Sequence, residues 1–422
     1  MAPKRQIAGE AVRHVTVIGA GAVGASTALA LRREGYAVTL IDRGEPGMGT
    51  SFGNAGILSV SSCVPIASPG LLWRLPELLS DPLGPLHIDW RYLPRFAPWL
   101  VRFMLAGRPA QIERISLALA SLLGQILPAY RELLGTDAFQ DLARPGGVLY
   151  AYQSDRAFEG ALASHELRRR RGVALSVLDQ SELRQMEPAL APSFRHGVLM
   201  HDSYRAVNPL RLVQSLTQSF VDAGGEVVRA AVQRIERADK GRLFAVTDQG
   251  RRELDTVAIC AGAWSKQLAR DCGVRVPLDT ERGYHVMLPR PGVTPQRPIG
   301  SGDHEFIATP MEHGLRLAGT VEFAGLAAPP DMRRAEVLLK AAREMFPGLA
   351  ADGMTTWMGF RPSMPDSLPV IGPAPGQDRV FLGFGHGHLG LTFGAITGLL
   401  LADLVAGRPS RVDLAPFRAD RF

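Results

Sequence analysis

The chain has 422 residues, of which 46% are hydrophobic and 21% are charged, a composition typical of a globular protein with room for two domains. Its net charge is +6, but the basic residues are dispersed and mixed with acids, which disfavours a nucleic-acid partner. The three cysteines form no CxxC pair and the histidines show no metal-ligand spacing, so we expect neither a disulfide scaffold nor a metal site.

The N-terminal residues lack the apolar stretch of a signal peptide. No uninterrupted apolar run reaches the ~18 residues of a membrane-spanning helix. Free cysteines fit a reducing compartment. We therefore expect a cytoplasmic protein without a spanning helix.

The first predicted elements form a β-α-β unit: a strand over residues 14–18, a helix over 22–34 and a strand over 37–42. Gly19, Gly21 and Gly24 form a GxGxxG turn between the first strand and the helix. The glycines permit a tight turn, close approach to a pyrophosphate and close helix–strand packing, and the helix N-terminus offers N–H groups to phosphates. Asp42 ends the second strand, where a carboxylate accepts ribose hydroxyls. This register predicts a dinucleotide site and disfavours NADP.

After residue 42 the sequence does not continue as further β-α-β units. Residues 50–69 predict a loop, and residues 71–106 hold three of the five tryptophans and five prolines, which we expect to divide the segment into short helices. The arginine run at 168–171 is interpreted as the solvated end of a helix. The further predicted elements are a helix over 111–134, strands over 146–153 and 196–202, a helix and strand over 208–228, a hairpin and buried strand over 243–265, strands between 283 and 322, and a last strand, glycine-rich turn and helix in the final 70 residues.

Five stretches together carry a resemblance to a known family. "RGEPGMGTSFGNAGILS" (43–59), "VAICAGAWS" (257–265), "RGYH" (282–285), "GFRPSMPDSLPVIG" (359–372) and "GFGHGHLGLT" (383–392) resemble the FAD-dependent D-amino acid dehydrogenases and, more widely, the glycine oxidase and D-amino acid oxidase superfamily. The resemblance covers nearly the whole chain.

The resemblance implies an α/β protein in which a Rossmann-type FAD-binding domain is interleaved with an α+β substrate domain built on a mostly antiparallel sheet. The FAD-binding domain is expected over residues 1–70, 205–275 and 355–422, and the substrate domain over 71–204 and 276–354.

The FAD site implied by the resemblance combines the turn at Gly19 with six further segments. Thr50 and Ser51 would donate hydroxyl hydrogen bonds to phosphate oxygens, and the backbone of Val232 would meet the adenine, although its side chain indicates only a core strand. N–H groups of "HGHLGLT" would point at flavin N1 and the C2 oxygen. The full set is Gly19, Ala20, Gly21, Ala22, Val23, Gly24, Asp42, Arg43, Thr50, Ser51, Asn54, Ala55, Gly56, Ile57, Val232, Ala261, Gly262, Trp264, Arg361, Gly387, His388, Leu389, Gly390, Leu391 and Thr392.

Some family members attach flavin through a cysteine just after the arginine of the "G-x-R" segment. Here Pro362, Ser363 and Met364 follow Arg361, so the FAD is expected to be noncovalent.

Four residues are candidates for the substrate site. Arg361 would fork onto a carboxylate through two parallel bonds, unless it forms an ion pair with an acid such as Asp366. Tyr284 is a second donor to the carboxylate or a core aromatic. His304 lines the pocket or lies on a surface turn, and His388 faces the flavin or is a loop histidine without a role.

The expected function is FAD-dependent oxidative deamination of a D-amino acid or secondary amino acid, D-proline and hydroxy-D-proline included, by hydride transfer from the α-carbon to flavin N5. One alternative is an oxygen-using oxidase of glycine, sarcosine or an opine. The others are an NAD-dependent dehydrogenase and an FAD protein acting on tRNA. The sequence leaves three electron acceptors open: oxygen, a partner protein and a membrane quinone, the last as in related peripheral membrane dehydrogenases. Tryptophans and arginines in 71–106 then suit peripheral contact with the inner face of the cytoplasmic membrane, unless these tryptophans belong to the core.

Overall fold

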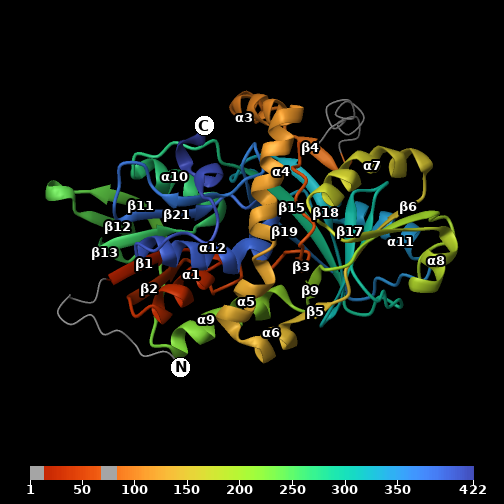
Figure 1. Ribbon diagram of the computed structural model, residues 1–422, viewed down its shortest axis with the longest axis horizontal. Coiled ribbons are helices and arrows are strands. Elements are labelled where there is room, and N and C mark those ends of the chain that lie inside the picture. The colour runs from red at the N-terminus through yellow and green to blue at the C-terminus, as the bar shows by residue number, and fades with distance from the viewer. Residues whose placement is uncertain (1–13, 68–82) are drawn as a thin grey trace.

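The computed structural model describes residues 14–67 and 83–422, and it shows two large β-sheets toward opposite ends of the molecule with helices packed on them (Figure 1). The mixed α/β architecture agrees with the fold expected from the sequence.

The first sheet has six strands in the order β10-β2-β1-β14-β21-β20. All neighbours are parallel except β20 and β21. It contains the predicted β-α-β unit, in which α1 (Ala22–Arg33) connects β1 and β2, so this prediction is confirmed. The strands are β1 (His14–Ile18), β2 (Ala37–Asp42), β10 (Glu226–Arg229), β14 (Thr256–Ile259), β20 (Val370–Pro373) and β21 (Val380–Phe384).

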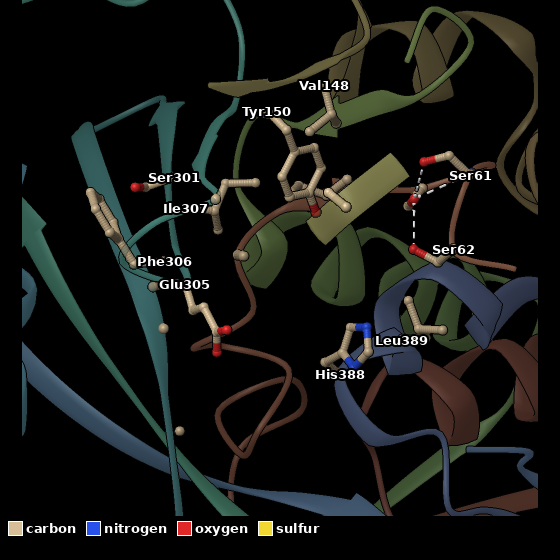
Figure 2. A pocket seen from close by; sticks show the side chains of 18 of the residues that line it. Ser61, Ser62, Val148, Tyr150, Ser301, Glu305, Phe306, Ile307, His388 and Leu389 are labelled. Atoms are coloured by element: carbon tan, nitrogen blue, oxygen red, sulfur yellow. Dashed lines mark hydrogen bonds between the residues drawn. The ribbon is translucent and has the colours of Figure 1, made fainter. Parts of the chain in front are cut away.

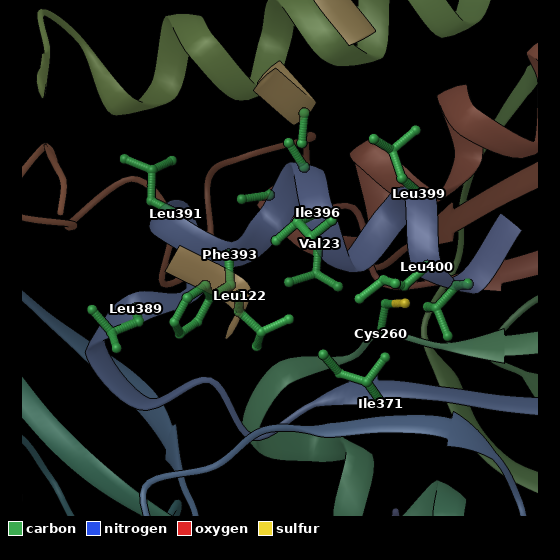
Figure 3. Close-up of a cluster of buried hydrophobic side chains, with 14 of the residues drawn as sticks. Val23, Leu122, Cys260, Ile371, Leu389, Leu391, Phe393, Ile396, Leu399 and Leu400 are labelled. Atoms are coloured by element: carbon green, nitrogen blue, oxygen red, sulfur yellow. The ribbon is translucent and has the colours of Figure 1, made fainter. Parts of the chain in front are cut away.

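The helix α12 (Gly390–Val405) packs closely on α1 because two of its residues lack side chains. A Cβ atom on Gly398 would lie 2.5 Å from the carbonyl carbon of Ser26, and one on Gly394 would lie 3.1 Å from that of Ala22. Around this contact the apolar side chains of α12 meet Val23, Leu122 and Cys260 (Figure 3). The helix is therefore enclosed on nearly all sides.

Two helical stretches in the described part of the chain, 109–134 and 387–405, are long and apolar enough to cross a membrane by length and composition. The second stretch is 78% buried inside the protein, which accounts for its apolar composition as a core helix. We expected no helix that could span a membrane, and hydropathy alone does not support this expectation.

The second sheet has nine strands in the order β19-β15-β18-β17-β16-β6-β8-β7, with β4 paired to β18. It is antiparallel except at β16–β6 and β18–β4, as expected. The helix α11 (Arg333–Met345) packs on β15 and β18 through Leu338, Ala342 and Met345. The strands are β4 (Leu86–Ile88), β6 (Val148–Tyr152), β7 (Leu175–Leu178), β8 (His196–Met200), β15 (Asp279–Leu288), β16 (Ile299–Ser301), β17 (Phe306–Met311), β18 (Gly314–Phe323) and β19 (Thr355–Ser363).

The division into domains stays a prediction. Its boundary at residue 355 falls just before β19, and this strand belongs to the nine-stranded sheet. Strand membership would therefore place the end of the substrate domain after Ser363.

The remaining elements connect and flank the two sheets. Ser154 caps α7 by accepting a hydrogen bond from Ala157 N, and Asn208 caps α9. Two three-stranded sheets consist of β11 (Val232–Arg237), β12 (Leu243–Thr247) and β13 (Gly250–Leu254), and of β3 (Ile57–Leu58), β9 (Tyr204–Ala206) and β5 (Ala143–Pro145). The other helices are α3 (Leu93–Ala106), α4 (Pro109–Leu123), α5 (Ile126–Leu134), α6 (Thr136–Leu142), α7 (Asp155–Arg170), α8 (Gln180–Met186), α9 (Pro209–Asp222) and α10 (Ser265–Asp271).

The tryptophan-rich segment is described from residue 83 onward, so Trp73 lies outside the described residues. Its prolines do not divide 93–106 into short helices as predicted, because α3 begins with Pro94 in its first turn and continues through Pro98. Trp99 is a core residue that donates from Nε1 to the carbonyl of Ser363 at 3.3 Å. Trp90, in contrast, is 75% exposed.

Candidate active site

The glycine turn between β1 and α1 has no room for a side chain at Gly19 or Gly24. Gly19 has φ +105°, and a Cβ atom there would lie 2.4 Å from the carbonyl oxygen of Cys260. A Cβ atom on Gly24 would lie 1.7 Å from the carbonyl oxygen of Gly19. The predicted steric roles of these two glycines follow from these contacts.

Asp42 connects the end of β2 to this turn. Its carboxylate accepts hydrogen bonds from Ala20 N at 2.7 Å and Gly44 N at 2.9 Å. The carboxylate is only half-buried and each oxygen keeps a further lone pair. Its contact with ribose hydroxyls stays a prediction.

The two hydroxyls predicted to bind phosphate differ in the structure. Ser51 Oγ accepts from Ala22 N at 3.0 Å, so its proton is free for an anion at the start of α1. Thr50 Oγ1 donates its only proton to the carbonyl of Phe360 at 2.8 Å. The prediction that Thr50 donates to phosphate is therefore not supported.

The loop after Ser51 is held by a buried arginine that the sequence analysis missed. Arg316 of β18 donates from Nη1 to the carbonyl oxygens of Phe52 at 2.8 Å and Asn54 at 2.7 Å. Within the described residues it forms no ion pair with a carboxylate, and burial lowers its pKa to about 10. An arginine between apolar strand residues, as in "GLRLAG", is the signal that could have found it.

The same loop packs on an aromatic pair from the nine-stranded sheet. His285 and Trp357 stack with ring centroids 5.1 Å apart, and a Cβ atom on Gly53 would lie 1.7 Å from Trp357. Burial lowers the pKa of His285 to about 3, so this imidazole stays neutral. Asn54 folds the loop by accepting from Gly56 N at 2.8 Å.

A cavity of about 850 Å³ lies between the loop over 50–57, the turn over 387–389 and the nine-stranded sheet. Figure 2 shows His388 and Leu389 on one side of it, the ring of Tyr150 in the middle and Glu305 on the sheet side. The predicted residues that line it are Thr50, Asn54, Ala55, Ile57, Tyr284, Arg361, Gly387, His388 and Leu389.

Arg361 reaches across the sheet to line this cavity. Its guanidinium lies over Gly283 of β15 and donates from Nη1 to the carbonyl of Thr320 at 3.1 Å and from Nη2 to that of Gly319 at 3.3 Å. Thr320 has the unusual φ of +54°, a strained conformation that recurs at functional sites. The other N–H groups of the guanidinium remain for a ligand.

Arg361 is not paired with Asp366, the structural alternative considered from the sequence. Asp366 instead pairs with Arg421, with Nε and Oδ2 2.8 Å apart. Glu281 lies opposite Arg361 in β15, and burial raises the pKa of this carboxyl. Burial lowers the pKa of the half-buried Arg361 guanidinium, and the nearby Glu281 carboxyl opposes this shift.

His388 opens onto the cavity from the short helix η3 (Gly387–Leu389), just before α12. Protein surrounds it at longer range, and this burial, together with the charge of Arg361, lowers its pKa to about 4. The imidazole is therefore neutral near pH 7. In the following turn Thr392 donates from Oγ1 to the carbonyl of Ile57 at 2.9 Å, which ties α12 to the loop.

Two predicted substrate contacts are not supported by the side-chain geometry. The hydroxyl of Tyr284 donates to Glu322 at 2.7 Å and accepts from Asp331 N at 3.0 Å, so its proton is not available to a substrate carboxylate. His304 faces α11, where its Nε2 lies 3.2 Å from Glu344 Oε2. The neighbouring Glu305 lines the cavity in its place.

The other predicted cofactor residues cluster around β2 and β14. Ala261 and the short helix η2 (Gly262–Trp264) follow β14, and the guanidinium of Arg43 lies 3.7 Å from the ring centroid of Trp264. Val232 begins β11, two residues after Ala230 N donates to the carbonyl of Asp42. These placements are consistent with the predicted site and do not test it. No group of residues that could hold a metal ion occurs in 14–67 or 83–422.

The fold and site define a flavin-dependent oxidoreductase: a mostly parallel sheet whose first turn excludes side chains at Gly19 and Gly24, beside a mostly antiparallel sheet from which Arg361 reaches a shared cavity. The chain belongs to the FAD-dependent oxidoreductase family DAO, whose model matches residues 14–404. Its cofactor is FAD.

The chain is similar to curated relatives of two names. It is 42% identical to a D-amino-acid oxidase of Bradyrhizobium diazoefficiens over 97% of this chain and 99% of the relative. It is 31% identical to a D-amino acid dehydrogenase of Paramagnetospirillum magneticum over 97% and 98%.

Solved structures share the fold. Glycine oxidase from Geobacillus kaustophilus superposes with a TM-score of 0.71 at 22% identity, over 97% of this chain and 99% of that chain. The reduced, FAD-bound L-α-glycerophosphate oxidase from Mycoplasma pneumoniae gives 0.69 at 16% identity, over 96% and 97%.

Proposed function

We propose that the protein catalyses the oxidative deamination of a D-amino acid or a secondary amino acid, with a noncovalent FAD as the hydride acceptor. The observation that carries the proposal is Arg361, a half-buried guanidinium that lines the cavity and is held by the carbonyls of Thr320 and Gly319. The names of the relatives, D-amino-acid oxidase and D-amino acid dehydrogenase, support the same substrate class.

Different residues of the chain would bind the cofactor and the substrate. Gly19, Gly24 and Ser51 would hold the FAD, which would supply an acceptor for the hydride of the substrate α-carbon. Arg361 binds the α-carboxylate and thereby orients the α-C–H bond, which is a proximity effect. The neutral His388 adds no positive charge that would repel the substrate ammonium. The amine must be neutral when the hydride leaves.

Noncovalent attachment has a direct test. Acid precipitation of the purified protein is expected to release FAD into the supernatant, because Pro362, Ser363 and Met364 offer no thiol next to Arg361. Flavin retained in the washed precipitate would contradict this part of the proposal.

The reaction class is tested by a substrate screen with an artificial electron acceptor. D-amino acids, D-proline, glycine, sarcosine and opines are supplied to the holoenzyme, with and without oxygen. Reduction of the dye by D-amino acids supports a dehydrogenase if no hydrogen peroxide forms when the dye is left out and oxygen is present. Peroxide formation from glycine or sarcosine would support the oxidase alternative.

We also propose that the enzyme contacts a membrane surface and passes electrons to a quinone. The helix α3 exposes Leu93, Val101, Met104 and Leu105, which share one helical face, and the 75% exposed Trp90 precedes it. Arg91 stacks over the ring of Trp90, with its guanidinium carbon 5.3 Å from the ring centroid. Apolar and aromatic residues beside arginines are typical of an interfacial helix. The cytoplasmic membrane face is the expected location.

A further inference from the structure

One wall of the cavity is the helix α7, and its contacts extend the substrate site away from Arg361. Residues at helical spacing on one face of α7 line the cavity. Most of them are small, namely Ala157, Gly160, Ala161 and Ser164, so this wall leaves room for a substrate side chain. The face ends at His165 and Arg168.

Arg168 corrects the interpretation of the arginine run as a solvated helix end. It is half-buried, lines the cavity and donates from Nε to the carbonyl of Ser61 at 3.3 Å. Its neighbour Arg169 pairs with Glu166, and Arg170 and Arg171 both pair with Glu113. Arg168 alone of the four forms no ion pair with a carboxylate in the described part of the chain.

Hydrogen bonds that run from Arg168 through His165 to Tyr152 leave the hydroxyl of Tyr152 as a second donor at this end of the cavity. Arg168 Nη1 lies 3.5 Å from His165 Nδ1, and His165 Nε2 lies 2.9 Å from the hydroxyl of Tyr152. An arginine can only donate, so Nδ1 accepts and the imidazole proton sits on Nε2. That proton is donated to the Tyr152 oxygen, which leaves the phenolic proton for another acceptor. Burial lowers the pKa of His165 to about 4, in agreement with a neutral ring.

Serine hydroxyls complete this end of the cavity. Ser62 donates to Ser59 Oγ at 2.8 Å, and Ser59 and Ser61 exchange a further hydrogen bond at 3.1 Å. Figure 2 shows Ser61 and Ser62 together on the side of the cavity opposite Glu305. A substrate group that accepts hydrogen bonds from the donors around Arg168 would therefore lie away from the Glu305 carboxylate.

The two acids of the cavity do not neutralise this end. Asp303 accepts from Gln153 N at 2.8 Å and from Ser154 N and Oγ at 3.2 and 2.6 Å, so it is held by the start of α7. Glu305 lies on the opposite wall. Among the described residues, the end of the cavity at Arg168 therefore combines a cation with hydroxyl donors and has no carboxylate counter-ion.

We propose that Arg168, with Tyr152 and Ser61, binds a second carboxylate of the substrate while Arg361 binds the α-carboxylate. The inference rests on the proposed function and narrows it to amino diacids, such as D-aspartate, D-glutamate or N-carboxyalkyl amino acids. A carboxylate accepts several hydrogen bonds at once, and its bonds to charged donors are the stronger ones.

The first test compares diacids with their amides on the holoenzyme. The kcat/KM for D-glutamate or D-aspartate is expected to exceed that for the matching amide by about tenfold or more, as for one charge-assisted hydrogen bond. Arg168→Gln is expected to abolish this preference by raising KM for the diacid, and Arg168→Lys to restore part of it. Arg169→Gln, one residue away on the solvent side, is the charge-matched control and should keep the preference.

The second test does not require turnover. Glutarate and butyrate are titrated into the oxidised holoenzyme by calorimetry, and glutarate is expected to bind about tenfold more tightly, again only when Arg168 is present. If no amino acid reduces the enzyme, the proposed function fails while this binding test still stands. Equal binding of glutarate and butyrate, equal rates on acids and amides, or equal effects of the two arginine variants would each overturn the second carboxylate site.

Discussion

Arg361 lies across Gly283: a Cβ atom on this glycine would stand 2.1 Å from Nη2 and 2.2 Å from Cζ of the guanidinium. The missing side chain lets an arginine of β19 cross β15 and reach two carbonyls of β18. Gly283 therefore positions the group that is proposed to bind the substrate.

Replacement of Gly283 tests this positioning. Gly283→Ala is expected to displace the guanidinium and to lower kcat/KM by about 10²-fold, as for a misplacement of about 1 Å. FAD content should stay near that of the unchanged protein, because the atoms nearest to the added methyl group all belong to Arg361. Flavin absorbance per protein and steady-state kinetics measure both effects. Unchanged kinetics would show that the Arg361 guanidinium does not need the space left by the missing side chain of Gly283.

Arg361 itself is tested by Arg361→Lys, which keeps the charge and loses the fork. The expected loss is about 2 to 4 kcal/mol of transition-state binding for the amino acid. It should be much smaller for the ester or amide of the same substrate, which lacks the carboxylate. Near-normal kcat/KM on the acid would remove Arg361 from the site.

The sequence predicted the β-α-β unit and the glycine turn because every residue in that stretch serves local structure. The motif around Arg361 also singled out this residue, which lines the cavity, and its contact with substrate stays a prediction. The sequence could not show where side chains from distant strands would turn. Tyr284 is directed to Glu322 and His304 to Glu344 by partners that lie 38 and 40 positions further along the chain. Arg168 was hidden in a run of four similar residues, three of which have surface partners.

Burial of neutral histidines predicts acid sensitivity. His386 is 4% exposed, its Nε2 lies 2.9 Å from Thr397 Oγ1, and burial lowers its pKa to about 3. The unfolded chain binds a proton at this residue near pH 6.5 and the folded chain does not, so the free energy of unfolding falls as the pH drops below that value. The stability is fully present above pH 6.5.

His386→Gln removes this contribution. Between pH 7 and pH 5 the variant is expected to lose about 2 kcal/mol less of its free energy of unfolding than the unchanged protein. Urea denaturation at the two pH values measures the difference. His313→Gln serves as the control because His313 is 73% exposed already in the folded protein. An equal loss in both variants would contradict the account of His386.

Membrane contact is tested by co-sedimentation with anionic liposomes. The variant Trp90→Ser/Leu105→Ser is expected to lower the bound fraction severalfold, since both side chains are exposed at α3. Leu162→Ser, at an exposed position of α7, is the control. Trp99 is left in place because it packs in the core. Absence of binding by the unchanged protein would refute the membrane proposal and leave a soluble acceptor or oxygen.

The central claim is that this FAD enzyme takes a hydride from a D-amino acid or secondary amino acid. The most direct measurement mixes the oxidised holoenzyme with such substrates without oxygen or any other acceptor and follows flavin absorbance. We expect rapid bleaching of the bound flavin, slowed strongly by Arg361→Lys. A flavin that stays oxidised with every D-amino and secondary amino acid, while dithionite still reduces it, would contradict the account.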